Sequence, residues 1–494
     1  MNDRIVKALI KLFERHRIVF WYDAKEELRN EFEALEIASI EKVVLNNNEF
    51  GIKFRILRQQ PEQQFLLYRE GPQPPDLENW LLDVQLGHGQ FRADYAAICL
   101  SELELGIEFA EVVENHPEFF KASKRKEALK KLLKTDDTFG LIRLKMVAVL
   151  AGSEPRLDSV IENLLAELAD KRDDKIKLVI RCCLDGYLWE QMARCYGYRS
   201  AEPGIRDFAI ELFKSCYAIG TDGPVHLTND ALVFLKRWKD SRQFEEAFET
   251  LSDECAALLG IEQDLVKRDF RELIDLDYFR LIDKKIISDL VRATSSKTIS
   301  PIDVGQWYRQ RRQSHWFNEF EHVYEAVSFG SKFIQAMAEV NLSMNDMANA
   351  VQLYSNSWFR LDQLYRKFTY HVRSSGQASL MEILTDQIEN LYSNNFLLKF
   401  NDTWQAFVDD CKKWSAFPVT LQRNFFEEWV NPFLKKENKI CVIISDALRY
   451  EIGDEFLSLI RQEDRYEATL EPSLAMLPSY TQLGMAALLP NKEL

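Results

Sequence analysis

An aspartate near the C-terminal end of the sequence stands where a parallel sheet places its ligands. Asp446 follows the apolar run Lys-Ile-Cys-Val-Ile-Ile-Ser of residues 439–445. Such a run, rich in β-branched residues and without alternation, is typical of a strand buried on both faces of a parallel sheet. Ligands of open α/β sheets bind beyond the carboxyl ends of the strands. The sequence therefore predicts that Asp446 binds a metal ion or a polar substrate.

A hydroxyl follows 35 residues later, at the start of a predicted helix. Pro478 and Ser479 are residue types that begin helices, so Thr481 falls in the first helical turn. Unpaired backbone N–H groups and the positive end of the helix dipole suit a phosphate there and stabilise an alkoxide. Thr481 is the predicted nucleophile because it projects from this turn, while Ser479 is better placed as the cap.

Each of these residues also has a structural interpretation. Asp446 is a residue type that caps the helix after any buried strand, here the helix expected over residues 447–460. Thr481 is a candidate capping hydroxyl, and Ser479 is either the cap or the reactive group itself. Arg449 is a solvated helix residue in one interpretation and a substrate or structural clamp in the other.

The two segments carry a recognisable pattern. Residues 445–451 read Ser-Asp-Ala-Leu-Arg-Tyr-Glu, and residues 478–484 read Pro-Ser-Tyr-Thr-Gln-Leu-Gly. The pattern resembles the alkaline phosphatase superfamily and, more closely, the PglZ family of BREX phage-defence systems, over about the last tenth of the chain. The resemblance implies that Asp446 is a first metal ligand and that Thr481 is a nucleophile that also contacts metal. It further implies a divalent metal cofactor, zinc, and other BREX proteins as partners.

The ligand set that the resemblance implies is incomplete here. A two-metal phosphohydrolase takes several further Asp and His ligands, but no His follows His371, and only Asp454 and Asp464 follow Asp446. We therefore expect a chain that is cut inside its last domain. On this view the 494-residue chain holds no stable metal and is catalytically inactive, whereas the complete protein is an enzyme.

Composition restricts the class of protein. The net charge of −15 argues against coating nucleic acid by bulk charge, so any such contact would use local basic patches. Eight Cys lack CxxC spacing, which argues against a disulfide framework or a zinc ribbon. No apolar run reaches transmembrane length and no signal peptide precedes the first helix. These features predict a cytoplasmic protein without membrane contact. The resemblance implies that it is a bacterial protein.

The expected fold is mixed: a small N-terminal α/β domain, a large mainly α-helical middle, and the start of an α/β alkaline-phosphatase-like domain. The predicted boundaries are residues 1–100, 101–300, 301–436 (rich in aromatics) and 437–494. Within the first domain we expect strands at 17–23, 43–45, 51–57 and 65–69, helices at 25–36 and 77–86, and a loop at 87–92. A turn at residues 46–48, Asn-Asn-Asn, is typical of a hairpin. Asp23, at a predicted strand end, is interpreted as a capping residue rather than a second metal or phosphoacceptor site.

Two basic stretches interrupt the acidic sequence. The stretch at residues 121–134 reads as a solvated helix face. Arg309, Arg311 and Arg312 follow an aromatic pair and are weak candidates for phosphate contact. Tryptophans and other aromatics in residues 301–436 are interpreted as packing rather than as a platform for stacking bases.

Two functional hypotheses arise from different features. In the first, the chain is the N-terminal part of a PglZ-like metal-dependent phosphohydrolase that acts on phosphodiesters, nucleic acid among them, with residues 1–436 as a scaffold for other BREX subunits. In the second, it is purely an interaction protein without hydrolytic activity, since over 400 residues precede the motif and assemble no chemistry of their own.

Overall fold

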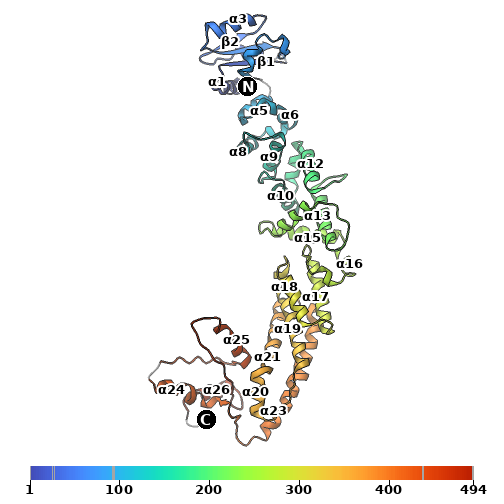
Figure 1. Cartoon of the computed structure of the whole chain (residues 1–494), viewed down its shortest axis with the longest axis vertical. Coiled ribbons are helices and arrows are strands. Elements are labelled where there is room, and N and C mark those ends of the chain that lie inside the picture. The colour runs from blue at the N-terminus through green and yellow to red at the C-terminus, as the bar shows by residue number, and fades with distance from the viewer. Residues whose placement is uncertain (1, 25, 27, 92–94, 437–438, 492–494) are drawn as a thin grey trace. The chain divides into compact units, whose positions relative to one another are not determined.

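The computed structural model describes residues 2–24, 26, 28–91, 95–436 and 439–491 (Figure 1). Its chain forms two compact units, one of residues 1–215 with 225–251 and one of residues 216–224 with 252–494. A small parallel sheet lies at the N-terminal end, and helices make up most of the remaining chain. The fold class expected from the sequence is thereby confirmed.

The N-terminal sheet has four parallel strands in the order β2-β3-β1-β4. Its strands are β1 (Ile18–Asp23), β2 (Ile40–Val44), β3 (Gln64–Glu70) and β4 (Gly89–Phe91). All six residues of β1 are buried, as a central strand covered on both faces requires. The apolar runs at the two central strands were therefore correct sequence signals.

Helices cover both faces of this sheet, and each face has its own core. Side chains of α1 (Asn2–Phe13) and α2 (Arg29–Glu33) pack on the face that contains Trp21. The opposite face, which contains Phe20, packs against α3 (Glu49–Phe54), the π-helical turn η1 (Arg55–Gln59) and α4 (Leu82–Leu86). The separation of α1 and α3 by the sheet can be followed in Figure 1.

Two predictions for this region were wrong. Residues 51–57 are not a strand, because Ile52 and Ile56 lie one helical turn apart and both pack on the sheet. The hairpin expected at residues 46–48 is also absent, since β2 and β3 are parallel and need a crossover between them. The helical segment of α3 and η1 supplies that crossover. The sequence of residues 51–57 was therefore interpreted with the period of a strand, whereas the segment has the period of a helix.

Of two predictions next to the central strands, the loop at residues 87–92 was wrong and the capping role of Asp23 was correct. The loop expected at residues 87–92 contains β4, which pairs with β1 through Val19 and Trp21. Residues 92–94 of that segment lie outside the described residues. Asp23 is buried and accepts hydrogen bonds from the Leu28 N–H (2.7 Å) and the Tyr68 hydroxyl (2.8 Å). It therefore caps the following turn, as expected, and its carboxylate is used structurally.

From residue 95 to residue 434 the described chain is mainly helical. The first part contains α5 (Tyr95–Leu103), η3 (Ile107–Phe109), α6 (Ala110–Asn115), α7 (Pro117–Phe120), α8 (Ser123–Leu132), α9 (Phe139–Ala151), α10 (Leu157–Ala169), α11 (Asp174–Arg181), α12 (Asp185–Tyr196), α13 (Ile205–Ile219), α14 (Asn229–Lys239), α15 (Glu245–Leu258) and α16 (Ile261–Leu265). The second part contains η4 (Phe270–Leu273), α17 (Arg280–Ser295), α18 (Pro301–Arg311), α19 (Phe317–Glu339), α20 (Met347–Leu353), η5 (Tyr354–Trp358), α21 (Phe359–Ser375), α22 (Ala378–Asn390), η6 (Leu391–Leu398), α23 (Lys399–Asp409), η7 (Gln422–Asn424), η8 (Phe426–Val430) and α24 (Asn431–Leu434). Among the described residues, no helix combines the length and the apolar character that crossing a bilayer requires.

The second unit is built on the antiparallel pair α19 and α21. Gly330 lets the neighbouring helices approach α19 closely, because a Cβ there would lie 2.9 Å from Ile388 and 3.3 Å from Phe368. Trp316 and Trp358 are buried in this part of the structure, so the interpretation of these aromatics as packing residues was correct. The close packing fixes the relative positions of side chains that α19 and α21 present to each other.

Arg311 corrects the prediction of a basic patch. Instead of facing solvent, its side chain is buried and forms a two-point ion pair with Asp283 of α17, with N···O distances of 3.1 and 2.5 Å. Its remaining nitrogen donates to the carbonyls of Ile274 (2.9 Å) and Leu276 (2.7 Å), and Tyr324 donates to Asp283 (2.6 Å). Arg311 is thus a core residue, which leaves Arg309 and Arg312 as the exposed members of that cluster.

The strand predicted at residues 439–445 is also wrong. These residues form no strand, and Val442 and Ile443 are 41% and 88% exposed. A buried strand needs neighbouring strands to satisfy its backbone groups, and no strand in the described part of the chain pairs with this segment. The strand pairing near it joins β5 (Thr420–Leu421) to β6 (Ser473–Leu474), in parallel.

Candidate active site

Asp446 lies in a tight turn at the end of the extended segment. Its Oδ1 accepts the N–H of Ala447 (3.0 Å), and Ala447 has a left-handed backbone with φ of 53°. The next helix, α25 (Tyr450–Ile460), begins four residues later with Arg449 as its N-cap. Asp446 therefore does not cap α25, and the residue is exposed.

Thr481 is the first residue of α26 (Thr481–Leu488). The N-cap is Tyr480, and no side chain accepts a cap hydrogen bond there. The expected capping role of Ser479 is thus wrong, because the helix begins one residue later than that role requires. Thr481 stands in the first turn as expected, where backbone N–H groups have no helical partner.

The structure brings Asp446 and Thr481 together. The Thr481 hydroxyl donates toward the Asp446 carboxylate, with Oγ1 at 3.4 Å from Oδ1 and 3.5 Å from Oδ2. Both side chains are exposed, so a ligand or an ion can reach them. A hydroxyl and a carboxylate from separate segments therefore share one accessible point at a helix N-terminus.

Contacts to η7 hold the segment that carries Thr481. Gly484 of α26 packs against the Gln422 amide, where a Cβ would lie 3.3 Å from Nε2. The same amide accepts the N–H of Met476 (3.3 Å), and Trp414 Nε1 donates to the carbonyl of Ala475 (2.8 Å). A side chain at position 484 would need the Gln422 amide to shift by a few tenths of an ångström.

A buried ion-pair network holds α25, which follows the Asp446 turn. Glu451 is fully buried and receives two hydrogen bonds from Arg366 Nε of α21, at 3.1 and 2.9 Å. Glu455, one turn further along α25, also pairs with Arg366 and accepts from Lys367 at 2.9 Å. Sequence reasoning missed this role, although the spacing of Glu451 and Glu455 on one helical face indicates a shared cationic partner.

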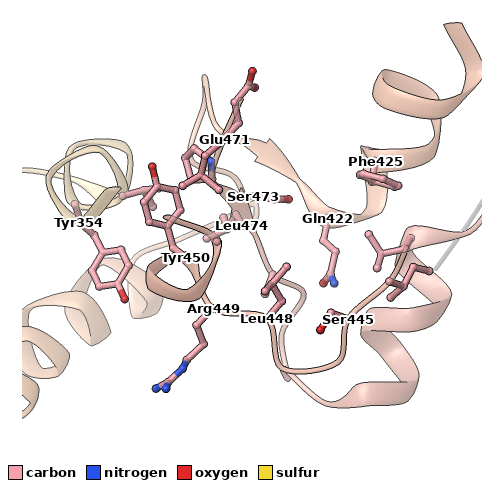
Figure 2. Close-up of a pocket in the computed structure, with 18 of the residues that line it drawn as sticks. Tyr354, Gln422, Phe425, Ser445, Leu448, Arg449, Tyr450, Glu471, Ser473 and Leu474 are labelled. Atoms are coloured by element: carbon pink, nitrogen blue, oxygen red, sulfur yellow. The ribbon is translucent and has the colours of Figure 1, made fainter. Parts of the chain in front are cut away.

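A cavity of about 600 Å³ opens beside these elements (Figure 2). Its wall is mostly apolar and aromatic, with a few polar groups at the 440s and 470s segments. The labelled side chains in Figure 2 are Tyr354, Gln422, Phe425, Ser445, Leu448, Arg449, Tyr450, Glu471, Ser473 and Leu474. Arg449 extends away from the other labelled groups, and its Nη2 lies 3.2 Å from Glu451 Oε1. Arg449 thus has a structural partner and an exposed charge at once.

The donor types at this point suit a divalent metal, but their number is small. A carboxylate and a hydroxyl are hard oxygen donors, which Zn²⁺ and Mg²⁺ both accept. Within the described residues, however, the Asp446–Thr481 contact joins two side chains, and a closed zinc site takes about four ligands. Asp446 and Thr481 therefore fit as part of a metal site and do not complete one.

The basic stretch at residues 121–134 is matched by acids. Lys126 pairs with Glu102, and Lys130 lies 3.1 Å from Glu104. Lys121 pairs with Glu118 at the start of the same stretch. Part of the charge of this stretch is therefore paired on the protein surface, which is typical of a solvated helix face.

Comparison with known proteins places both residues inside a segment that matches a family. Residues 425–494, which include Asp446 and Thr481, match the family described as the BREX system PglZ alkaline phosphatase-like domain. Proteins of the alkaline phosphatase-like class are in general metal-dependent. The resemblance carried by the two motifs is thereby confirmed, with the domain at the C-terminal end of the chain.

The similarity to individual proteins extends over the whole chain. It is 30% identical to the alkaline phosphatase-like protein BrxZ of Escherichia coli O9:H4 (strain HS), of which it covers 61%. It is 25% identical to the alkaline phosphatase-like protein PglZ of Bacillus cereus (strain H3081.97), of which it covers 60%. The chain thus spans about three fifths of the length of these curated relatives. No solved structure matches the chain.

Proposed function

We propose that this chain is the N-terminal part of a PglZ-like, metal-dependent phosphohydrolase of BREX anti-phage defence, with phosphodiesters, nucleic acids among them, as its substrates. The observation that carries the proposal is the approach of the Thr481 hydroxyl to Asp446 at 3.4 Å, inside the segment that matches the PglZ domain. Its place of action is the bacterial cytoplasm, and its partners are other BREX proteins.

In this proposal Thr481 is the nucleophile. Its oxygen forms a bond to phosphorus, its proton passes to solvent, and the leaving oxygen departs with the electrons of the broken P–O bond. Water then cleaves the phosphothreonine and restores the hydroxyl. A bound divalent metal, for which zinc is our candidate, would lower the pKa of the hydroxyl and offset the charge that develops on the phosphoryl oxygens. Asp446 would hold that metal and Thr481 would contact it, while Arg449 would either turn from Glu451 toward the phosphate or stay as a structural clamp.

The remaining ligands of this centre lie, in our proposal, outside the 494 residues. A metal held by two side chains binds weakly and leaves the threonine hydroxyl unactivated at neutral pH. Residues 437–494 are then the beginning of the catalytic domain, after an α/β domain at 1–100 and helical regions at 101–300 and 301–436. The greater length of BrxZ and PglZ is consistent with this division.

Metal removal tests the proposal. In a protein that carries these residues at the length of its curated relatives, we expect chelation to abolish hydrolysis of an aryl phosphodiester and added Zn²⁺ to restore it. Asp446→Asn removes a charged ligand, so it should lower metal affinity about tenfold or more as well as the rate. Hydrolysis that persists in chelator, or an Asp446→Asn variant that binds and turns over like the parent, would contradict the metal role.

An exposed apolar patch favours a second role, that of a docking surface within residues 1–436. Leu77 is 97% exposed, and Phe50 and Trp80, whose ring centroids lie 5.1 Å apart, are 67% and 57% exposed. Clustered exposed aromatics of this kind mark protein interaction sites. The patch supports the proposal that the first domain binds another BREX subunit.

Substitution of the patch tests the docking role. Phe50→Ser with Trp80→Ser should weaken capture of proteins from the same BREX system about tenfold or more, since aromatic anchors dominate such interfaces. Val233→Ser, at a residue that is 66% exposed outside the patch, is the matched control and should leave capture unchanged. Equal capture by the patch variant and the control would exclude this surface.

A further inference from the structure

Two histidines of the second unit face each other across α19 and α21. The Nδ1 atoms of His322 and His371 lie 3.0 Å apart, although the residues are 49 positions apart in the sequence. His322 near the start of α19 meets His371 near the end of α21, while Phe333 further along α19 meets Tyr365. The antiparallel course of the two helices thus places the two rings on facing positions.

A separation of 3.0 Å fits two arrangements. Two neutral imidazoles can share one hydrogen bond, in which one Nδ1–H donates to the other Nδ1. Alternatively, both nitrogens bind one metal ion, since two nitrogens at about 2.0–2.1 Å from a tetrahedral Zn²⁺ lie roughly 3.3 Å from each other. Imidazole nitrogen is a preferred ligand of zinc, nickel and copper. The pair therefore has the spacing of a hydrogen bond and lies within a few tenths of an ångström of the spacing of two ligands of one ion.

Aromatic neighbours fix the orientation of the two rings. Phe329 stacks on His371 with centroids 5.5 Å apart, and Tyr370 presents its edge or face to both histidines. Side chains held in this way lose little further freedom when they bind an ion. Both histidines remain partly exposed, so an ion from solvent can reach them.

Charged side chains of both signs lie near the pair. Burial lowers the pKa of His371, and His322 and Lys367 lower it further, while Glu325 and Glu321 raise it. Lys367 is paired with Glu455 at 2.9 Å, and Glu325 accepts the Tyr308 hydroxyl at 2.6 Å.

We propose that His322 and His371 form a binding site for a transition-metal ion of the zinc class, separate from the Asp446 and Thr481 site. Each histidine contributes Nδ1, and water completes the coordination. An ion held between the rings links the start of α19 to the end of α21. Its binding therefore stabilises this helix pair and is independent of any hydrolytic reaction.

Titration of the metal-free 494-residue chain with Zn²⁺, followed by calorimetry and by Co²⁺ absorption spectra, tests the site. The parent should bind an equivalent of metal that His322→Asn and His371→Asn each weaken at least about tenfold. His226→Asn, at an exposed histidine, is the matched control and should retain that equivalent. Asp446→Asn should retain it as well, which separates this site from the candidate active site.

The two arrangements of the histidine pair also predict different effects of Zn²⁺ on the thermal stability of the protein. If the site binds metal, Zn²⁺ raises the thermal unfolding midpoint of the parent and of His226→Asn but not of the His322→Asn, His371→Asn double variant. Circular dichroism of each variant shows whether it is folded, so a loss of binding can be assigned to the missing ligand. Equal binding by the parent and both single histidine variants would overturn the proposal and leave the pair as a hydrogen bond.

Discussion

Replacing Thr481 by alanine is expected to lower metal-dependent phosphodiester hydrolysis by on the order of a thousandfold or more, because the substitution removes the atom that attacks phosphorus. The fold should be unaffected. Thr481 is exposed and begins α26, and its side chain does not cap that helix. The measurement is turnover of an aryl phosphodiester by the parent and by Thr481→Ala, both at the length of the curated relatives. Circular dichroism should show that the variant is folded.

Ser479 provides the matched control for this experiment. It lies two residues before Thr481, is also exposed, and does not cap α26. Ser479→Ala should therefore retain most of the activity. If Ser479→Ala is the inactive variant and Thr481→Ala turns over like the parent, the nucleophile is Ser479, and the assignment of Thr481 is wrong.

The second large effect concerns stability and involves Arg311. Arg311→Ala leaves Asp283 buried without its cation and removes the donors to the carbonyls of Ile274 and Leu276. Breaking a buried pair from one side costs about 3–5 kcal/mol of unfolding free energy. Denaturant unfolding, monitored by fluorescence, should show this loss in the transition of the second unit.

Two further variants separate burial from charge. Arg312→Ala removes the same charge from an exposed neighbour and should change stability by less than about 0.5 kcal/mol. Tyr324→Phe removes one donor to Asp283 and should cost about 1–2 kcal/mol. Equal stabilities of Arg311→Ala and Arg312→Ala would show that the Arg311 pair does not hold α17 and α18 together.

Local sequence patterns predicted the elements that residue type and spacing identify without knowledge of distant contacts. The apolar runs at β1 and β3 and the place of Thr481 in the first turn of α26 could be inferred from residue type and spacing alone. The helix at residues 49–59 could not, because Ile52 and Ile56 fit a strand and a helix equally well until the parallel pairing of β2 and β3 is known. The period of a short apolar segment is therefore decided by topology.

Other parts of the structure depend on contacts between distant residues. The segment at residues 439–445 has the composition of a buried strand, yet it stays exposed where no described strand adjoins it. The charge on Arg311 predicted a surface residue, whereas Asp283 and two carbonyls make its burial favourable. The docking of α25 through Arg366 and Glu451 joins residues 85 positions apart, which no local pattern reveals.

For the candidate site, too, local patterns predicted some features correctly and others not. Asp446 and Thr481 were named from the ends of the elements that carry them, and the structure places their side chains 3.4 Å apart. Ser479 was assigned the helix cap because serine favours that position, but the helix begins after Tyr480. The metal role of Asp446 and the nucleophile role of Thr481 remain predictions. Both residues are exposed in the structure.

Acid quenching during turnover, followed by mass spectrometry of the peptides, tests the central claim most directly. A protein at the length of the curated relatives is mixed with metal and an aryl phosphodiester, quenched within the first turnovers, and digested. The account predicts a phosphorylated peptide whose modified residue is Thr481, present with metal and absent in chelator. Rapid hydrolysis without any phosphorylation of Thr481, or with phosphorylation at another residue, would contradict it.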